Sequence, residues 1–151
     1  MSDVNLHDLE TEAAPERPAG YEISRARVGE LVGGAALGLS VYDLPPGQSG
    51  FPYHYEHGRE EWLLVLAGRP TLRDPDGEYE LEPGDLVLFP EGEEGAHKVT
   101  NNGEDVARIA MLSNKDEPSI TFYPDSGKIG FWPDGKLFRL ADEVDYFDGE
   151  T

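Results

Sequence analysis

Short runs of alternating apolar and polar residues, separated by turn-forming residues, recur through the middle of the chain. In residues 36–44, Leu37, Leu39 and Val41 alternate with smaller or polar residues before the turn Pro45-Pro46-Gly47. Such a period of two is typical of a strand with one buried face. Further strands are expected at residues 61–67, 71–73, 79–81, 85–89, 96–100 and 106–112. Many short strands with frequent turns predict an all-β sandwich or barrel.

One of these runs is apolar on both faces. In residues 62–66 one face can line the interior, whereas Trp62, Leu64 and Leu66 need a second cover. That cover is the N-terminal arm, the C-terminal tail or the sheet of a second subunit. An exposed apolar patch of this size is unusual for a soluble monomer, so a homodimer is the favoured interpretation.

The two ends of the chain differ from its centre. Residues 1–20 contain Pro15, Pro18 and repeated Glu and are expected to form a flexible N-terminal arm. Residues 21–113 form the expected barrel. Residues 114–151 are rich in aromatic residues and are expected to pack on the barrel as a C-terminal extension. Turn motifs predict strands at 119–123, 128–132 and 136–139, and a short helical turn at 140–145. Aromatic residues of the tail more often cover a sheet than close a cavity, but Phe131 or Trp132 as a lid is an alternative.

Composition excludes several classes of function. Acidic residues number 31 against 12 basic ones, which disfavours binding to nucleic acid phosphates. The absence of cysteine excludes disulfides and thiolate metal ligands, so imidazole and carboxylate are the strong ligands that remain. The first residues are polar and acidic, and neither a signal peptide nor a membrane span is expected. A cytoplasmic location follows as the default.

Histidine and carboxylate side chains lie at spacings that suit a metal. Because side chains two positions apart on a strand share a face, His54 and Glu56 are expected to point into one cavity, and Tyr53, Tyr55 and His57 away from it. Glu61 opens the next apolar run, and His97 follows a Pro-x-Gly turn. Imidazole with carboxylate suits first-row divalent metals, and two His with one carboxylate is the facial arrangement of non-haem iron sites.

Two motifs in this region resemble those of the cupin superfamily, over about residues 36–113. Glu61-x6-Gly68 matches the end of the first motif, and Gly84-x5-Pro90-x-Gly92 with His97-x3-Asn101 matches the second, with two extra residues before the histidine. Two departures lie in the first motif. The gap from Gly47 to His54 is one residue longer, and Glu56 replaces the second histidine of the His-x-His pair.

The resemblance implies a double-stranded β-helix of two packed antiparallel sheets with one divalent metal in the barrel mouth. His54, Glu61 and His97 match the family's metal ligands, and Glu56 occupies the position of the fourth, with His57 as its rival if a bulge turns it inward. The metal itself (Fe, Mn, Ni, Zn or Cu) stays open. A carboxylate in place of an imidazole lowers the positive charge of the site and should weaken its attraction for anionic substrates.

The function expected from the resemblance is action on, or binding of, an unidentified small molecule. A dioxygenase or isomerase-type metalloenzyme is one interpretation. The alternative is a non-catalytic module for a small molecule or sugar, with a weakened or lost metal. Glu56 and Glu60 are the candidate proton carriers of an enzyme. Tyr53, Tyr55 and Arg73 are the candidates for orienting a substrate.

Overall fold

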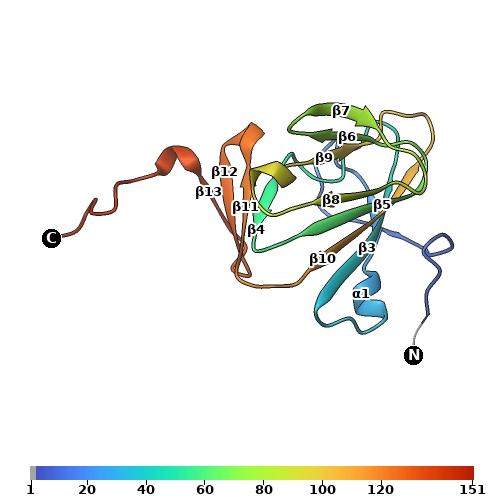
Figure 1. Cartoon of the computed structure of the whole chain (residues 1–151), viewed down its shortest axis with the longest axis horizontal. Coiled ribbons are helices and arrows are strands. Elements are labelled where there is room, and N and C mark those ends of the chain that lie inside the picture. Colours follow the sequence, from blue (N-terminus) through green and yellow to red (C-terminus); the bar gives the residue numbers. More distant parts are fainter. Residues whose placement is uncertain (1–2) are drawn as a thin grey trace.

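Antiparallel strands arranged as a barrel are the main elements of the chain, of which the computed structural model describes residues 3–151 (Figure 1). The strands are β1 (Glu12–Ala13), β2 (Ser24–Ala26), β3 (Leu37–Leu44), β4 (Tyr55–His57), β5 (Glu61–Ala67), β6 (Thr71–Asp74), β7 (Gly77–Glu80), β8 (Leu86–Phe89), β9 (Lys98–Thr100), β10 (Ala107–Asn114), β11 (Ser119–Tyr123), β12 (Lys128–Trp132) and β13 (Lys136–Arg139). The helical segments are α1 (Val28–Leu31), η1 (Glu93–Gly95), η2 (Pro124–Ser126) and η3 (Leu140–Asp142). The prediction of an all-β fold is confirmed. None of the helices in the described residues is long and apolar enough to cross a membrane.

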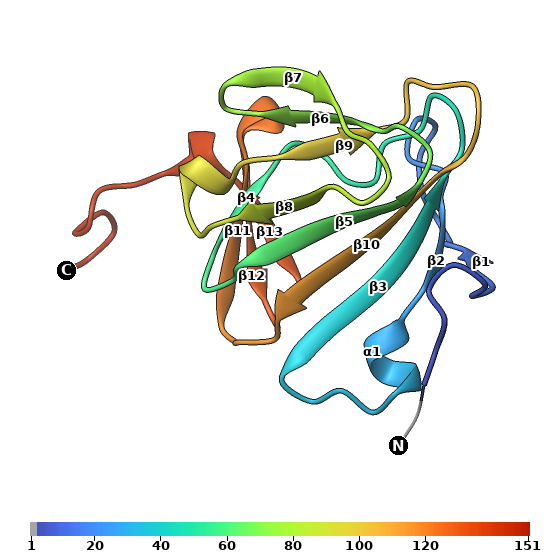
Figure 2. The ribbon, with the colours of Figure 1, turned by 45° about the vertical axis from the view of Figure 1, so that its right-hand side comes forward.

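The strands form three sheets. The largest has the order β1-β2-β3-β10-β5-β8, and its strands lie side by side in Figure 2. A four-stranded sheet, β13-β12-β11-β4, joins the C-terminal extension to the strand that follows His54. The third sheet has the order β7-β6-β9. Because β4 pairs with β11, residues far apart in the sequence meet beside the first motif.

The barrel interior follows from side-chain alternation. Leu63 and Val65 on β5 belong to the main core, as does Ile109 on β10. The same alternation places Glu61 on the inner face of β5 and Ser113 on the inner face of β10, and these two residues are register partners. The interior therefore changes along its length from an apolar core to a polar cavity.

The N-terminal arm covers part of the outer face of the large sheet. Val4, Leu6 and Leu9 pack in a second cluster that contains Leu64 and Leu66 of β5. These two are among the residues for which the sequence required a second cover. The expectation of an exposed or mobile arm over residues 1–20 is therefore wrong for this part of it, because sparse apolar side chains in a polar segment are enough to attach it.

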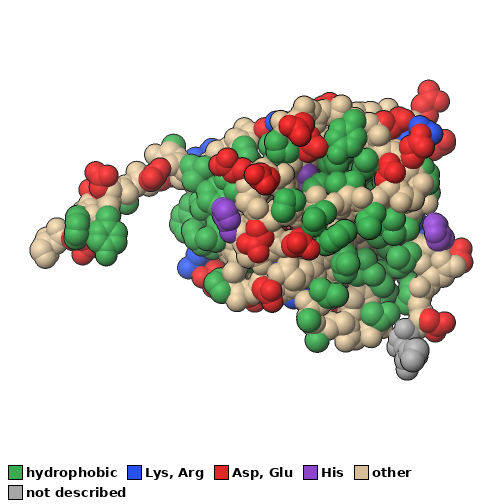
Figure 3. Space-filling view, in the orientation of Figure 1, with side chains coloured by type: hydrophobic (Ala, Val, Ile, Leu, Met, Phe, Trp, Pro, Cys, Tyr) green, Lys and Arg blue, Asp and Glu red, His purple; other side chains and the backbone are tan. Residues whose placement is uncertain are grey.

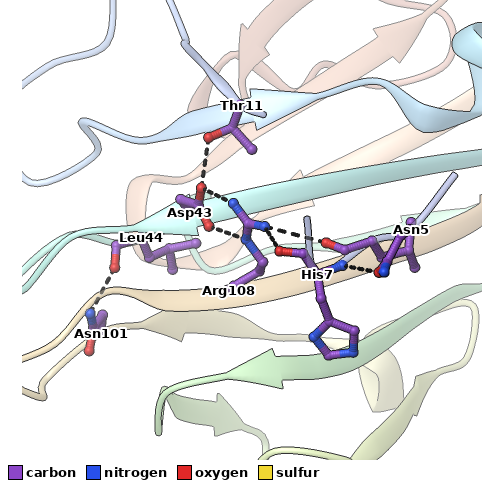
Figure 4. A network of polar contacts seen from close by, with 8 residues as sticks. Asn5, His7, Thr11, Asp43, Leu44, Asn101 and Arg108 are labelled. Carbon is purple, nitrogen blue, oxygen red and sulfur yellow. Dashed lines mark hydrogen bonds and ion pairs between the residues drawn. The ribbon is translucent and has the colours of Figure 1, made fainter. Parts of the chain in front are cut away.

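A polar network also fastens the arm (Figure 4). Arg108 of β10 donates two hydrogen bonds of 2.7 Å to Asp43 of β3 and one of 2.6 Å to the carbonyl oxygen of His7. Thr11 donates to the same Asp43 carboxylate. The hydrogen bonds from Arg108 and Thr11 lower the pKa of Asp43 despite the opposing effect of burial. The arm is thus tied to both central strands by charge-assisted hydrogen bonds.

Apolar surface remains exposed beyond the arm. Leu86 and Leu88 of β8 are 59% and 43% exposed. Hydrophobic side chains gather on this side of the molecule in the space-filling view (Figure 3). The homodimer stays a prediction.

The C-terminal extension has two parts. Its three strands and the turn η3 lie at the predicted positions, and β11 pairs with both β4 and β12. Beyond η3 the chain runs away from the barrel (Figure 1). Tyr146 and Phe147 there are 90% and 77% exposed and contact mainly each other. The structure does not show the expected packing on the barrel for this last part, whose apolar side chains Val144, Tyr146 and Phe147 are exposed.

Candidate metal centre

His54 and His97 face each other across a β-bridge. The backbone N–H of His54 donates to the carbonyl oxygen of His97 (3.1 Å), and the N–H of His97 donates to that of His54 (2.8 Å). The ring centroids are 4.6 Å apart. Two residues 43 positions apart in sequence, one from each motif, are thereby fixed side by side.

Both imidazole rings point the same nitrogen toward Glu61. The Nδ1 atom of His54 is hydrogen-bonded to the carbonyl oxygen of Pro52 (2.8 Å), and that of His97 to the carbonyl oxygen of Gly95 (2.9 Å). The two Nε2 atoms lie 3.8 and 3.5 Å from the Oε2 atom of Glu61. The ligand atoms of the three residues all lie within 4.8 Å of one another. Carbonyl acceptors on Nδ1 are the usual means of fixing the tautomer of a metal-binding histidine.

Burial prepares this group for a cation. His54 and His97 are 8% and 3% exposed. Burial lowers the pKa of both imidazoles, that of His97 to about 3, so both rings are neutral near pH 7. Burial and the nearby charge of Glu56 raise the pKa of Glu61 to about 8. The buried Nε2 atom of His97 has no hydrogen-bond partner among residues 3–151. The residues therefore fit a divalent metal, which would satisfy the unpaired nitrogen.

The extra residues of the second motif form the turn η1 before His97. At Gly95 an added Cβ atom would lie 1.8 Å from the carbonyl oxygen of Pro90, so this close approach requires glycine. The His97 ring then stacks on Phe89 of β8, with centroids 3.7 Å apart and planes 7° apart. The insertion thus changes the turn while the histidine keeps its place beside β5.

Two of the three residues, His54 and Glu61, border a cavity of about 380 Å³. Its wall is completed by side chains from β3, β4, β10 and the C-terminal extension. The lining residues are Tyr42, Phe51, Pro52, His54, Glu56, Arg59, Glu61, Met111, Ser113, Thr121, Tyr123 and Trp132. This volume is in the range of small-molecule sites.

Glu56 lies in this cavity but outside the close group of three. Thr121, its register partner on β11, donates a 2.8 Å hydrogen bond to its Oε1 atom. The Nε1–H of Trp132 donates in turn to the hydroxyl oxygen of Thr121 (2.8 Å). The Oε2 atom of Glu56 is buried and has no hydrogen-bond partner among the described residues. Glu56, the expected fourth ligand, is therefore hydrogen-bonded to β11 through one oxygen, and its other oxygen has no hydrogen-bond partner among the described residues.

His57, the rival for the fourth ligand position, and Glu60, the second candidate proton carrier, lie outside the cavity. His57 is exposed and packs edge-on against Tyr55 and Phe122, because strand alternation turns it away from Glu56. Glu60 is exposed and accepts a hydrogen bond from Trp62 Nε1 on the outside of β5. Neither lines the cavity.

The three residues expected to orient a substrate also lie outside the cavity. Tyr53 and Tyr55 line a separate apolar pocket. Arg73 stacks over the Tyr53 ring and makes a bidentate ion pair with Asp125. That part of the prediction does not fit the structure. Period-two alternation from His54 already directs both tyrosines to the opposite face.

Several lining residues were missed by sequence reasoning. Met111 and Ser113 share the inner face of β10 with Ile109, so alternation could have found them. Thr121 and Trp132 depend on the pairing of β11 with β4, which no local pattern shows. Trp132 was expected to cover a sheet or, as the alternative, to close the cavity as a lid, and it lies in the cavity wall.

Comparisons with known proteins agree with this geometry. The family model described as the cupin domain matches residues 40–113. A sugar phosphate isomerase from a cupin superfamily of Silicibacter pomeroyi superposes with a TM-score of 0.82, at 22% identity over 97% of this chain and 98% of that one. A candidate sugar phosphate isomerase from Acidithiobacillus ferrooxidans gives a TM-score of 0.78 at 27% identity, over 83% of this chain and 81% of that one. The chain belongs to the cupin superfamily, and its barrel is the expected double-stranded β-helix.

Curated relatives match a shorter part. Ribosomal oxygenase 2 of Rattus norvegicus is 32% identical over an alignment of 79 residues, and the match covers 39% of this chain. The chain spans only 17% of the length of that relative.

Proposed function

We propose that the chain is a metal-dependent enzyme of the isomerase type, which acts on a small hydroxylated carbonyl compound. One arrangement carries the proposal: the histidine Nε2 atoms converge on Glu61 while an uncommitted oxygen of Glu56 lies in the same cavity. The 27% identity to the candidate sugar phosphate isomerase supports this class of reaction.

His54, Glu61 and His97 would hold one divalent ion of the first transition row. When bound there, such an ion supplies Lewis acidity that polarises a substrate oxygen and acidifies the adjacent C–H bond. The buried neutral histidines and the carboxylate are the ligand types that iron, manganese, nickel, zinc and copper accept.

Glu56 is placed to move the proton. Its Oε1 atom is held by Thr121, which leaves Oε2 as the free acceptor in the cavity. Oε2 would take the proton from the carbon beside the substrate carbonyl and return it to the carbonyl carbon. A hydroxyl proton passes between the two oxygens, so the composition is unchanged. Tyr123 and Trp132 wall the cavity and limit the access of water to this step.

Solvent-proton exchange tests the proposal. Metal-loaded protein is incubated in D2O with a panel of aldose and ketose phosphates, and deuterium incorporation is followed by NMR. Glu56→Gln should keep the metal and lose exchange by roughly a hundredfold or more, the usual contribution of a general base. Glu60→Gln is the matched control and should exchange at the wild-type rate, because Glu60 lies outside the cavity. Equal loss in both variants, or no exchange by metal-loaded wild type, contradicts the proposal.

Oxygen-dependent chemistry is the second candidate. Two histidines and one carboxylate form the ligand set of non-haem iron oxygenases, and part of the chain is 32% identical to ribosomal oxygenase 2. Substrate-dependent oxygen uptake by the iron(II)-loaded protein, without deuterium exchange, would favour it. Ligand binding with neither reaction would leave the non-catalytic module.

A further inference from the structure

Arg59 is a cavity residue whose hydrogen-bonding capacity is unused. Arg59 lines the same cavity as Glu56 and Glu61. The Nε atom is buried and has no hydrogen-bond partner among residues 3–151. An Nη atom of Arg59 lies 4.0 Å from a carboxylate oxygen of Glu117, which is the limit for an ion pair and beyond hydrogen-bond distance. By contrast, Arg73 and Arg108 are each bound bidentately by a carboxylate.

The loop that carries Arg59 is held in place on both sides. Asn114 of β10 donates to the carbonyl oxygen of Gly58 (3.2 Å) and accepts from the N–H of Glu60 (2.9 Å). Gly58 has a φ of +82°, and a Cβ atom there would lie 3.1 Å from the carbonyl oxygen of Pro118. A single amide thus spans Arg59, which fixes the direction in which its side chain leaves the loop.

The charges of the cavity leave Arg59 unmatched once a metal is present. A divalent cation balances the carboxylates of Glu56 and Glu61, and Arg59 then adds one positive charge. Its influence reaches the metal ligands, since its charge opposes the rise in the pKa of Glu61. A carboxylate at position 56 is expected to weaken the attraction of the site for anions. The positive charge of Arg59 acts in the opposite direction.

We propose that Arg59 binds the anionic oxygens of the substrate, a phosphate or a carboxylate, while the metal site holds its hydroxyl or carbonyl end. A guanidinium presents a planar fork of N–H donors that matches either group. The inference rests on the proposed function in taking this cavity as the place where the substrate binds.

Calorimetric titration of zinc-loaded protein tests this role. The probes share one carbon skeleton: D-ribose 5-phosphate, D-ribonate and neutral D-ribose. Wild type should bind at least one charged probe roughly tenfold or more tightly than ribose, as a charge-assisted hydrogen bond permits. The probe that is preferred identifies phosphate or carboxylate as the group bound.

Variants show whether Arg59 causes the preference. Arg59→Gln should remove it while zinc content stays at the wild-type level, and Arg59→Lys should retain part of it. Arg69→Gln is the control, because Arg69 is an exposed arginine outside the cavity, paired with Glu80 and Glu82. Equal binding of charged and neutral probes by wild type, or an unchanged preference in Arg59→Gln, overturns the inference.

The enzyme proposal and the role of Arg59 can each be contradicted without the other. If metal-loaded wild type shows no deuterium exchange but its preference for a charged probe disappears in Arg59→Gln, the enzyme proposal fails and the role of Arg59 stands. If deuterium exchange requires metal and Glu56 while Arg59→Gln keeps the preference, the role of Arg59 fails alone.

Discussion

Thr121 donates a 2.8 Å hydrogen bond to Glu56, and this contact joins the C-terminal extension to the cavity beside the candidate metal site. The two residues are register partners on β11 and β4. The hydroxyl of Thr121 is itself held by Trp132 of β12. The extension therefore sets the orientation of the carboxylate that we propose as the base.

Replacing Thr121 with valine should slow catalysis without loss of metal. The change keeps the side-chain shape and removes the donor to Glu56, so deuterium exchange should fall by about tenfold to a hundredfold, as expected for a misplaced catalytic group. Thr121→Ser, which restores the hydroxyl, should recover most of the rate. Metal content is measured for both variants, and a loss of metal in Thr121→Val alone would show a different role.

Replacing Glu61 with glutamine should change how stability depends on pH in the metal-free protein. Between pH 4.5 and about 8 the folded protein keeps a proton on Glu61 that the unfolded chain has lost. The contribution of this group to the free energy of unfolding therefore falls as pH rises, by at most about 1.4 kcal/mol per pH unit. Glu61→Gln has no titrating carboxyl group at this position, so its free energy of unfolding does not fall for this reason.

Urea unfolding in the presence of a chelator, at pH 5 and pH 8, measures the effect. Relative to wild type, Glu61→Gln should gain stability on going from pH 5 to pH 8. When metal is added, wild type should be stabilised more than the variant. A constant difference between the two proteins at both pH values would contradict the assignment to Glu61.

Asn101, the last residue of the second motif, should matter for stability and not for chemistry. It is 1% exposed, and its amide donates to the carbonyl oxygens of Leu44 and Asp105 and accepts from the N–H of Gly103. Asn101→Ala should lower the free energy of unfolding by roughly 2–4 kcal/mol, because buried groups lose their partners. Asn102→Ala, on the exposed neighbour, should change it by less than about 0.5 kcal/mol. Equal effects would contradict the structural role.

Removing residues 144–151 should leave the barrel unchanged. Tyr146 and Phe147 there contact each other and are largely exposed. The melting temperature and metal content of the shortened protein should match those of the full chain within error. A clear drop in either would show that these aromatics cover a surface of this chain or of a second copy.

Much of the fold could be predicted because its signals are local. Period-two alternation and turn residues define the strands, including the three of the C-terminal extension. The attachment of the arm was not predictable in this way. It depends on Val4, Leu6 and Leu9 meeting the outer face of β5, and on Arg108 reaching back to His7.

The candidate site likewise has residues that could be predicted from the sequence and residues that could not. His54, Glu61 and His97 could be recognised from their motifs, and the structure brings their ligand atoms together. Arg59 could not, because the direction of its side chain depends on the left-handed Gly58 and on the hydrogen bonds from Asn114. Tyr53 and Tyr55 were chosen for nearness in sequence, although strand alternation places them on the opposite face.

A metal held by both histidines is tested most directly by the metal content of untagged protein purified without chelator, measured by elemental analysis beside the His54→Ala, His97→Ala double variant. Wild type should carry close to one first-row transition metal per chain, and a folded double variant should carry none. A folded wild type that carries no metal and binds no added iron, manganese, nickel, zinc or copper would contradict that expectation.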